Sequence, residues 1–132
     1  MADGWRNLKQ WPELILDRLE DAGVARITLN RPEKRNALNA ELVTVFFEAL
    51  EIVRADRELK TVITRGAGTV FSSGLDLHYL RAVSAGDQLD WDRPTLTIRL
   101  AEALRSFPRI MIAQVHGYCL AGGRISSCYV IW

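Results

Sequence analysis

Apolar and polar positions alternate near the start of the chain. Two apolar-rich runs, Leu14–Leu19 and Val24–Asn30, lie on either side of a short polar stretch that ends at Gly23. In the second run apolar residues such as Ala25 and Ile27 recur at every other position, which is the period of a strand with one buried face. The pattern predicts two antiparallel strands joined by a tight turn.

The period then changes to that of a helix, after Arg31–Arg35, where a proline interrupts the second strand. Asn39 is a candidate N-cap, and we expect the helix to end near Asp56. Charged residues fall largely on the face opposite the apolar one. The apolar residues that share one helical face are Leu42, Val45, Phe46, Ala49, Leu50 and Val53.

The order strand, helix, strand is repeated in the second half. The β-branched run Thr61–Thr64 predicts a strand that stops at Gly66–Gly68, and Leu96–Phe107 has the apolar spacing of an amphipathic helix broken by Pro108. Ile110–Val115 predicts the next strand. Because a helix between two strands implies a crossover, we expect parallel pairing and an α/β fold.

Composition limits the classes of function. The chain has 132 residues, 48% of them hydrophobic and 25% charged, as expected for one soluble domain. A net charge of +1 gives no basic field that would favour nucleic acid or an anionic membrane as partner. No membrane span or secretory signal is recognised, so we expect a cytoplasmic protein. Two cysteines, Cys119 and Cys128, match neither a disulfide framework nor a metal site.

Two glycine-rich turns carry the candidate chemistry. The first is Gly74-Leu75-Asp76, and the second, Gly117–Gly123, follows about forty residues later. Each comes after a predicted strand and can offer backbone N–H groups to a ligand. Two peptide donors that converge on a developing oxyanion are a common device of acyl-group chemistry.

Three segments resemble one protein family. Asn30–Asn39, Phe71–Leu77 and Ala113–Gly123 are similar, in this order and spacing, to the enoyl-CoA hydratase/isomerase family, the crotonase superfamily. The resemblance runs from about residue 14 to residue 123. Any one segment alone would be a weak signal, whereas the three together are specific.

The resemblance implies a fold and a ligand. It implies a crotonase-like spiral of ββα units, of which residues 1–132 hold only the N-terminal part, with an atypical tail at 124–132. It further implies an acyl-CoA thioester ligand, a link to β-oxidation of fatty acids, no cofactor apart from the CoA of the substrate, no metal, and a trimer-based homo-oligomer.

The resemblance also assigns the site. The backbone N–H groups of Leu75 and Gly122 resemble the two donors of the family's oxyanion hole, and Ser73 corresponds to a backbone position that contacts adenine. A helix starting after Gly122 would add its dipole to the field. The residues that resemble substrate-binding positions are Lys34, Arg35, Ala37, Ser73, Gly74, Asp76 and Leu77.

Plainer interpretations stay open beside these assignments. Lys34 and Arg35 are either cations for a phosphate or solvated loop charges. Asp76 is expected to cap a helix rather than to act as an acid or base. His78 and His116 are expected to be surface or packing residues, since no catalytic arrangement can be built from their spacing.

The tail at 124–132 departs from the family at the positions that determine the reaction. In the hydratases the first catalytic glutamate falls where this chain has Ile125, and the second would lie beyond Trp132. The chain is therefore either a hydratase or isomerase by descent, or an inactive truncated acyl-CoA-binding remnant or oligomerisation partner. Truncation is the expected origin, with a genuinely short member as the alternative. Because a shortened spiral exposes a sheet edge, we expect poor solubility or association.

Overall fold

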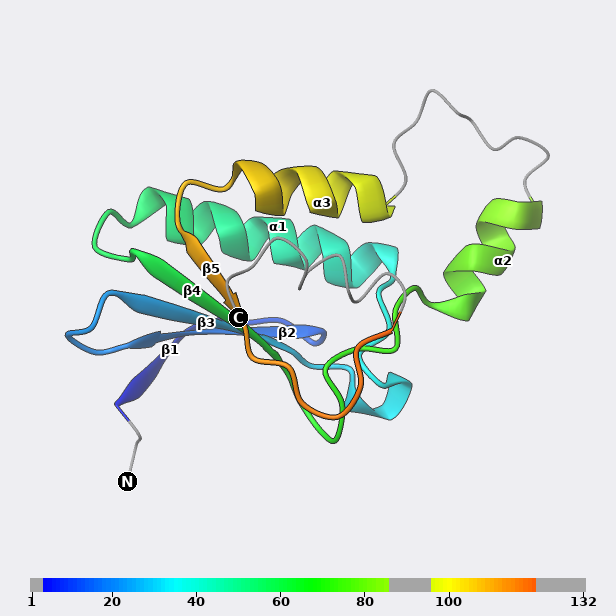
Figure 1. Cartoon of the computed structure of the whole chain (residues 1–132), viewed down its shortest axis with the longest axis horizontal. Coiled ribbons are helices and arrows are strands. Elements are labelled where there is room, and N and C mark those ends of the chain that lie inside the picture. The colour runs from blue at the N-terminus through cyan, green and yellow to red at the C-terminus, as the bar shows by residue number, and fades with distance from the viewer. Residues whose placement is uncertain (1–3, 86–95, 121–132) are drawn as a thin grey trace.

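A five-stranded mixed sheet forms the centre of the computed structural model, which describes residues 4–85 and 96–120 (Figure 1). The strands follow each other in chain order across the sheet. The first three are antiparallel, and the third, fourth and fifth are parallel. Their bounds are β1 (Trp5–Gln10), β2 (Leu14–Leu19), β3 (Val24–Leu29), β4 (Thr61–Gly66) and β5 (Ile110–Ala113).

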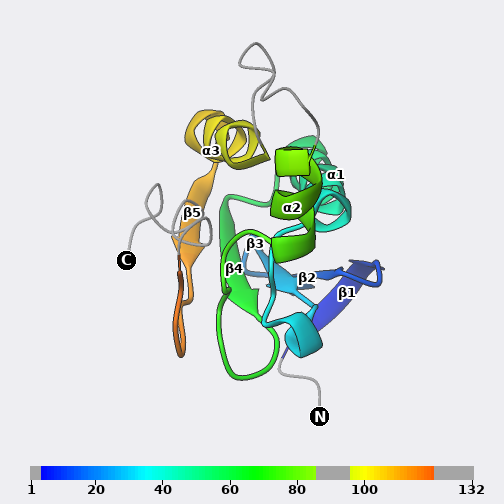
Figure 2. The same ribbon diagram turned by 90° about the vertical axis from the view of Figure 1, so that its right-hand side faces the viewer.

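Two long helices form a layer over one face of this sheet. The long helices α1 (Ala40–Ala55) and α3 (Leu96–Ser106) lie side by side on that face, as both views show (Figure 1 and Figure 2). Helix α2 (Leu77–Ala85) stands apart, beyond the N-terminal end of α1 (Figure 1). A short 3-10 helix, η1 (Pro32–Lys34), lies in the loop between β3 and α1.

The core lies between the helical layer and the sheet. Alternate residues of the strands face α1 and α3, which explains the period of two seen in the sequence. Each fully buried aliphatic side chain contributes about 1.5 to 3 kcal/mol relative to an exposed one. Those with no exposed surface include Leu14, Leu16, Ile27, Val62, Leu42 and Val53.

The predicted hairpin, crossover and amphipathic helices are confirmed. Helix α1 begins after Asn39, whose side-chain oxygen accepts a hydrogen bond of 2.9 Å from the Leu42 N–H, and its C-cap is Asp56. The fifth strand ends at Ala113, two residues earlier than predicted. Strand β1 was not predicted, because Trp5–Gln10 is largely exposed and lacks a clear apolar alternation.

A second, shorter layer of pairing follows the parallel strands. Leu38, which follows β3, pairs with Leu75, which follows β4, in a parallel bridge. Ser72, which also follows β4, forms a second parallel bridge with Cys119, which follows β5. Each unit thus contains a long strand, a short paired segment and, where the chain is described, a helix. This is the ββα repeat that the family resemblance implied.

We expect Asn39→Ala to lower the free energy of unfolding by about 1 kcal/mol, because the Leu42 N–H loses the side-chain oxygen that caps it. Asn39→Asp serves as the control, since a carboxylate oxygen can accept the same hydrogen bond. Urea unfolding followed by circular dichroism measures both variants. Equal stability of the alanine variant and the parent chain would contradict the prediction.

Candidate functional site

A surface pocket of about 470 Å³ lies where the loop after β3 meets the loop after β4. Every predicted site residue lines it except Gly74 and Gly122. Gly74 is buried in the same loop, and Gly122 lies outside the described residues. The lining residues are Glu33, Lys34, Arg35, Ala37, Ser73, Leu75, Asp76, Leu77 and His78. The structure therefore brings together residues from two segments about forty positions apart.

The backbone around Leu75 is oriented by its pairing with Leu38. The Leu38 N–H donates to the Gly74 carbonyl at 2.7 Å, and the Asp76 N–H donates to the Leu38 carbonyl at 2.9 Å. In a trans peptide the N–H points opposite to the C=O, so the Leu75 N–H points away from Leu38. It makes no hydrogen bond to any residue in the described part of the chain. Gly74 allows this turn because its φ is +94°.

The second glycine-rich segment runs on the side opposite Leu38. There, the Ser72 N–H donates to the Tyr118 carbonyl at 3.4 Å, and the Leu120 N–H donates to the Ser72 carbonyl at 3.1 Å. The first glycine turn therefore lies between the loop of residues 31–38 and the segment of residues 117–120. The Leu75 N–H, which has no partner among the described residues, points away from the loop of residues 31–38.

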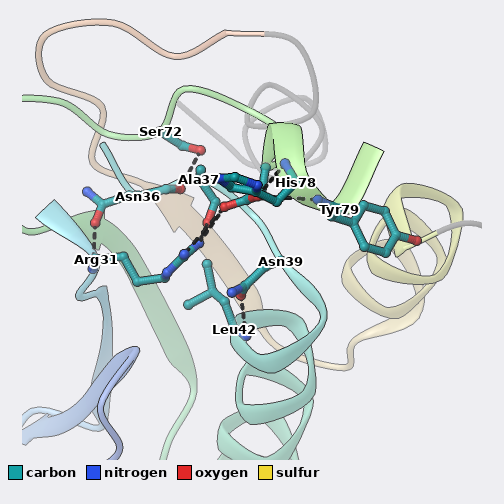
Figure 3. A network of polar contacts seen from close by, with 9 residues as sticks. Arg31, Asn36, Ala37, Asn39, Leu42, Ser72, His78 and Tyr79 are labelled. Atoms are coloured by element: carbon teal, nitrogen blue, oxygen red, sulfur yellow. Dashed lines mark hydrogen bonds and ion pairs between the residues drawn. The ribbon is translucent and has the colours of Figure 1, made fainter. Parts of the chain in front are cut away.

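A buried asparagine fastens the loop after β3. The side chain of Asn36 has no exposed surface, and it accepts from the Arg31 N–H at 2.9 Å (Figure 3). It donates to the Ala67 and Val70 carbonyls at 2.8 and 3.0 Å. The backbone carbonyl of Asn36 accepts from the Ser72 hydroxyl at 2.9 Å. Sequence reasoning missed Asn36 and Ser72, because an asparagine beside charged residues is typical of an exposed turn.

Two cations sit on the outer surface of that loop. Lys34 and Arg35 are exposed, and neither forms an ion pair with another described residue. The Arg35 backbone has a φ of +52° and its carbonyl accepts from the Ser73 N–H at 2.9 Å. Both positive side chains are thus held at the rim of the pocket and are available to an anionic ligand.

Asp76 caps a helix, as predicted. Its Oδ1 accepts from the N–H groups of His78 and Tyr79 at 2.8 and 3.3 Å, at the start of α2. Its Oδ2 lies 3.4 Å from the Arg31 guanidinium, with 10% and 13% of the two side chains exposed. Burial raises the pKa of the Asp76 carboxyl, but the Tyr79 and His78 amides and the Arg31 cation together outweigh burial and lower it. Asp76 is therefore ionised at neutral pH.

The two histidines occupy different surroundings. The Nε2 atom of His116 lies 3.0 Å from the Gly68 carbonyl oxygen and is part of the loop packing. His78 is exposed, as expected, but it lines the pocket, which its position in the sequence did not indicate.

Within residues 4–85 and 96–120, no three histidine, cysteine or acidic side chains gather closely enough to hold a metal ion. No helix among these residues has the length and apolar character needed to cross a membrane.

Comparisons with known proteins identify the family of this chain. Residues 20–127 match the family described as enoyl-CoA hydratase/isomerase. The chain belongs to this family. It is 35% identical over 108 residues to the hydroxycinnamoyl-CoA hydratase-lyase of Pseudomonas fluorescens, a match that covers 80% of this chain and 39% of that protein. It is 33% identical over 116 residues to the mitochondrial Δ(3,5)-Δ(2,4)-dienoyl-CoA isomerase of Rattus norvegicus, covering 80% and 36%.

Solved structures show the same fold. An enoyl-CoA hydratase/isomerase from Xanthobacter autotrophicus Py2 superposes with a TM-score of 0.79 at 35% identity, covering 92% of this chain and 45% of that one. The crotonase-like fold is thereby confirmed. This member of the enoyl-CoA hydratase/isomerase family spans less than half the length of these three relatives.

We expect Asn36→Ala to lower the free energy of unfolding by about 2 to 4 kcal/mol, since one buried carbonyl, one part-buried carbonyl and one part-buried N–H lose the Asn36 side chain as partner. Asn30→Ala is the matched control, because the Asn30 side chain makes one exposed hydrogen bond of 3.4 Å to the Pro12 carbonyl. Urea denaturation measures both. Similar losses in the two variants would refute a special role for Asn36.

The Asp76 carboxylate makes stability depend on pH. Its pKa is lowered from the ordinary value of 3.8, so its contribution is present above that pH and is lost as the pH falls through the folded-state value. Asp76→Asn should cost about 1.5 to 3 kcal/mol at neutral pH, where charged hydrogen bonds are lost. The difference between parent and variant, from urea unfolding at several pH values, should stay constant from about pH 5 to 7 and shrink below the ordinary pKa. A stability difference between parent and variant that stays the same below pH 3.8 would contradict this expectation.

Proposed function

We propose that this chain binds acyl-CoA thioesters in the pocket and polarises the thioester carbonyl through the backbone N–H of Leu75. The observation that carries the proposal is the orientation of this N–H, which has no partner in the described part of the chain and belongs to a residue lining the pocket. An N–H held in this way can donate to an oxygen that gains negative charge.

The cations at the pocket rim support the same ligand class. CoA carries several phosphate groups, and an ammonium and a guanidinium without ion-pair partners suit such groups. Lys34 and Arg35 lie on the same pocket as Leu75, so one extended ligand can reach both ends. The two relatives described above also carry acyl-CoA compounds in their names.

The proposed chemistry is stabilisation of an enolate or tetrahedral oxyanion. By analogy with the oxyanion hole of a serine protease, each such donor is expected to lower the barrier by about 3 kcal/mol. We propose the backbone N–H of Gly122 as the second donor. The chain then follows its family as a hydratase or isomerase.

A second candidate function is binding without turnover. It is favoured by one observation from the sequence, the isoleucine at position 125 where the hydratases carry a glutamate. Hydration needs a group that transfers protons, and an alkyl side chain cannot do so. Crotonyl-CoA and a 3-enoyl-CoA together distinguish the two candidates. Loss of 2-enoyl absorbance from the first compound, or its appearance from the second, supports the enzyme, and calorimetric binding with constant absorbance for both supports the binder.

The double substitution Lys34→Ala/Arg35→Ala should weaken CoA binding by about tenfold to a hundredfold, because charge-assisted hydrogen bonds to phosphate are lost. Isothermal titration calorimetry with CoA and with pantetheine, which lacks phosphates, measures the effect. Pantetheine binding should change little. Arg57→Ala/Lys60→Ala is the control, since both side chains are exposed and lie beyond the C-terminal end of α1. Equal weakening by both double variants would count against a phosphate site.

A further inference from the structure

We propose that the ion pair between Arg31 and Asp76 is a positioning device that orients the Leu75 amide and couples it to the cationic loop. The inference rests on the proposed function. It concerns two residues that need not touch the reacting atoms. Arg31 and Asp76 are 45 positions apart and belong to the two loops that form the pocket.

Asp76 restrains the backbone immediately after Leu75. Its N–H donates to the Leu38 carbonyl, while its carboxylate holds both the first turn of α2 and the Arg31 guanidinium. Just before Leu75, the carbonyl of Gly74 is held by the Leu38 N–H. This carbonyl and the Leu75 N–H belong to one peptide group, and the next peptide group is held through the Asp76 N–H, so a shift of Asp76 would turn the Leu75 amide.

Arg31 restrains the other loop. Its Nη1 donates to the Ala37 carbonyl at 2.5 Å (Figure 3). The Arg31 carbonyl accepts from the N–H groups of Lys34 and Asn36, both at 2.9 Å. The same residue thus anchors the turn that carries the cations and contacts the carboxylate beside the amide. A ligand phosphate that draws the loop inward would act on Arg31 and, through it, on Asp76.

The charges of the pair are well placed for this role. With 13% and 10% of the side chains exposed, Arg31 and Asp76 are little screened by water. The planar guanidinium contacts a carbonyl and a carboxylate at once, which a lysine ammonium on its flexible stem does not reproduce with the same geometry. The position of Asp76 therefore depends on an arginine at position 31.

Asp76→Asn tests the charge of the pair in a chain that is less stable but keeps its helix cap. Asparagine is a good N-cap, so the side-chain oxygen can still accept from the first turn of α2 while the charge that faces Arg31 is removed. Arg31→Lys keeps the charge but loses the double contact. Asp56→Asn is a closely matched control: Oδ1 of Asp56 accepts from the Glu58 N–H at 3.0 Å and Oδ2 pairs with Arg18 at 3.1 Å, at the opposite end of α1.

The readout is the absorption maximum of bound cinnamoyl-CoA. A hydrogen bond to the thioester carbonyl polarises the conjugated chain and moves its absorption to longer wavelength, whereas affinity for CoA reports the cationic loop. In Asp76→Asn and Arg31→Lys we expect the wavelength shift to fall by at least half. We expect the gain in affinity from phosphate, measured as CoA against pantetheine, to fall several-fold. The Asp56→Asn control should match the parent in both.

The outcomes separate this inference from the proposed function. A parent chain that binds no CoA, or that binds cinnamoyl-CoA without a wavelength shift, overturns the proposed function and the inference with it. A parent that binds and shifts, with both variants keeping the full shift, overturns only the inference. Far-UV circular dichroism establishes that each variant is folded. If Asp76→Asn is unfolded, the wavelength shift of Arg31→Lys tests the inference in the same way.

Discussion

The site depends on a second round of backbone pairing beyond the ends of the parallel strands. Parallel pairing of β3, β4 and β5 brings their carboxyl ends to one edge of the sheet, and the bridges from Leu38 to Leu75 and from Ser72 to Cys119 then align the loops that follow. The Leu38–Leu75 bridge leaves one N–H facing away from its partner. Without this bridge neither the pocket nor the orientation of the amide would be determined.

Much of the fold could be predicted because its signals are local. A period of two or of 3.6 residues, and a cap such as Asn39, act over a few positions and can be recognised in one sequence. The pairing of β1 with β2 depends on a mostly polar strand with little apolar alternation, so Trp5–Gln10 gave no comparable signal. Asn36 escaped prediction for a related reason, since its carbonyl partners are 31 and 34 positions away.

The candidate site was predicted as a set of residues but not as an arrangement. Glycine spacing and the family resemblance indicated Gly74, Leu75 and the cationic loop, because these features lie within short motifs. The contact between Arg31 and Asp76 joins residues 45 positions apart, and no spacing rule indicates it. The direction of the Leu75 N–H likewise depends on which side of the segment pairs with Leu38.

A site built from backbone donors separates binding from proton transfer. The Leu75 amide can polarise a carbonyl whatever side chain the residue carries, so a leucine is as suitable there as a smaller residue. Proton transfer, in contrast, needs an ionisable side chain at a defined distance from the ligand. One scaffold can therefore keep its ligand class while the reaction changes or is lost. On the function proposed above, this chain holds and polarises a thioester, and with Ile125 in place of a glutamate any turnover obtains its proton carrier from another position.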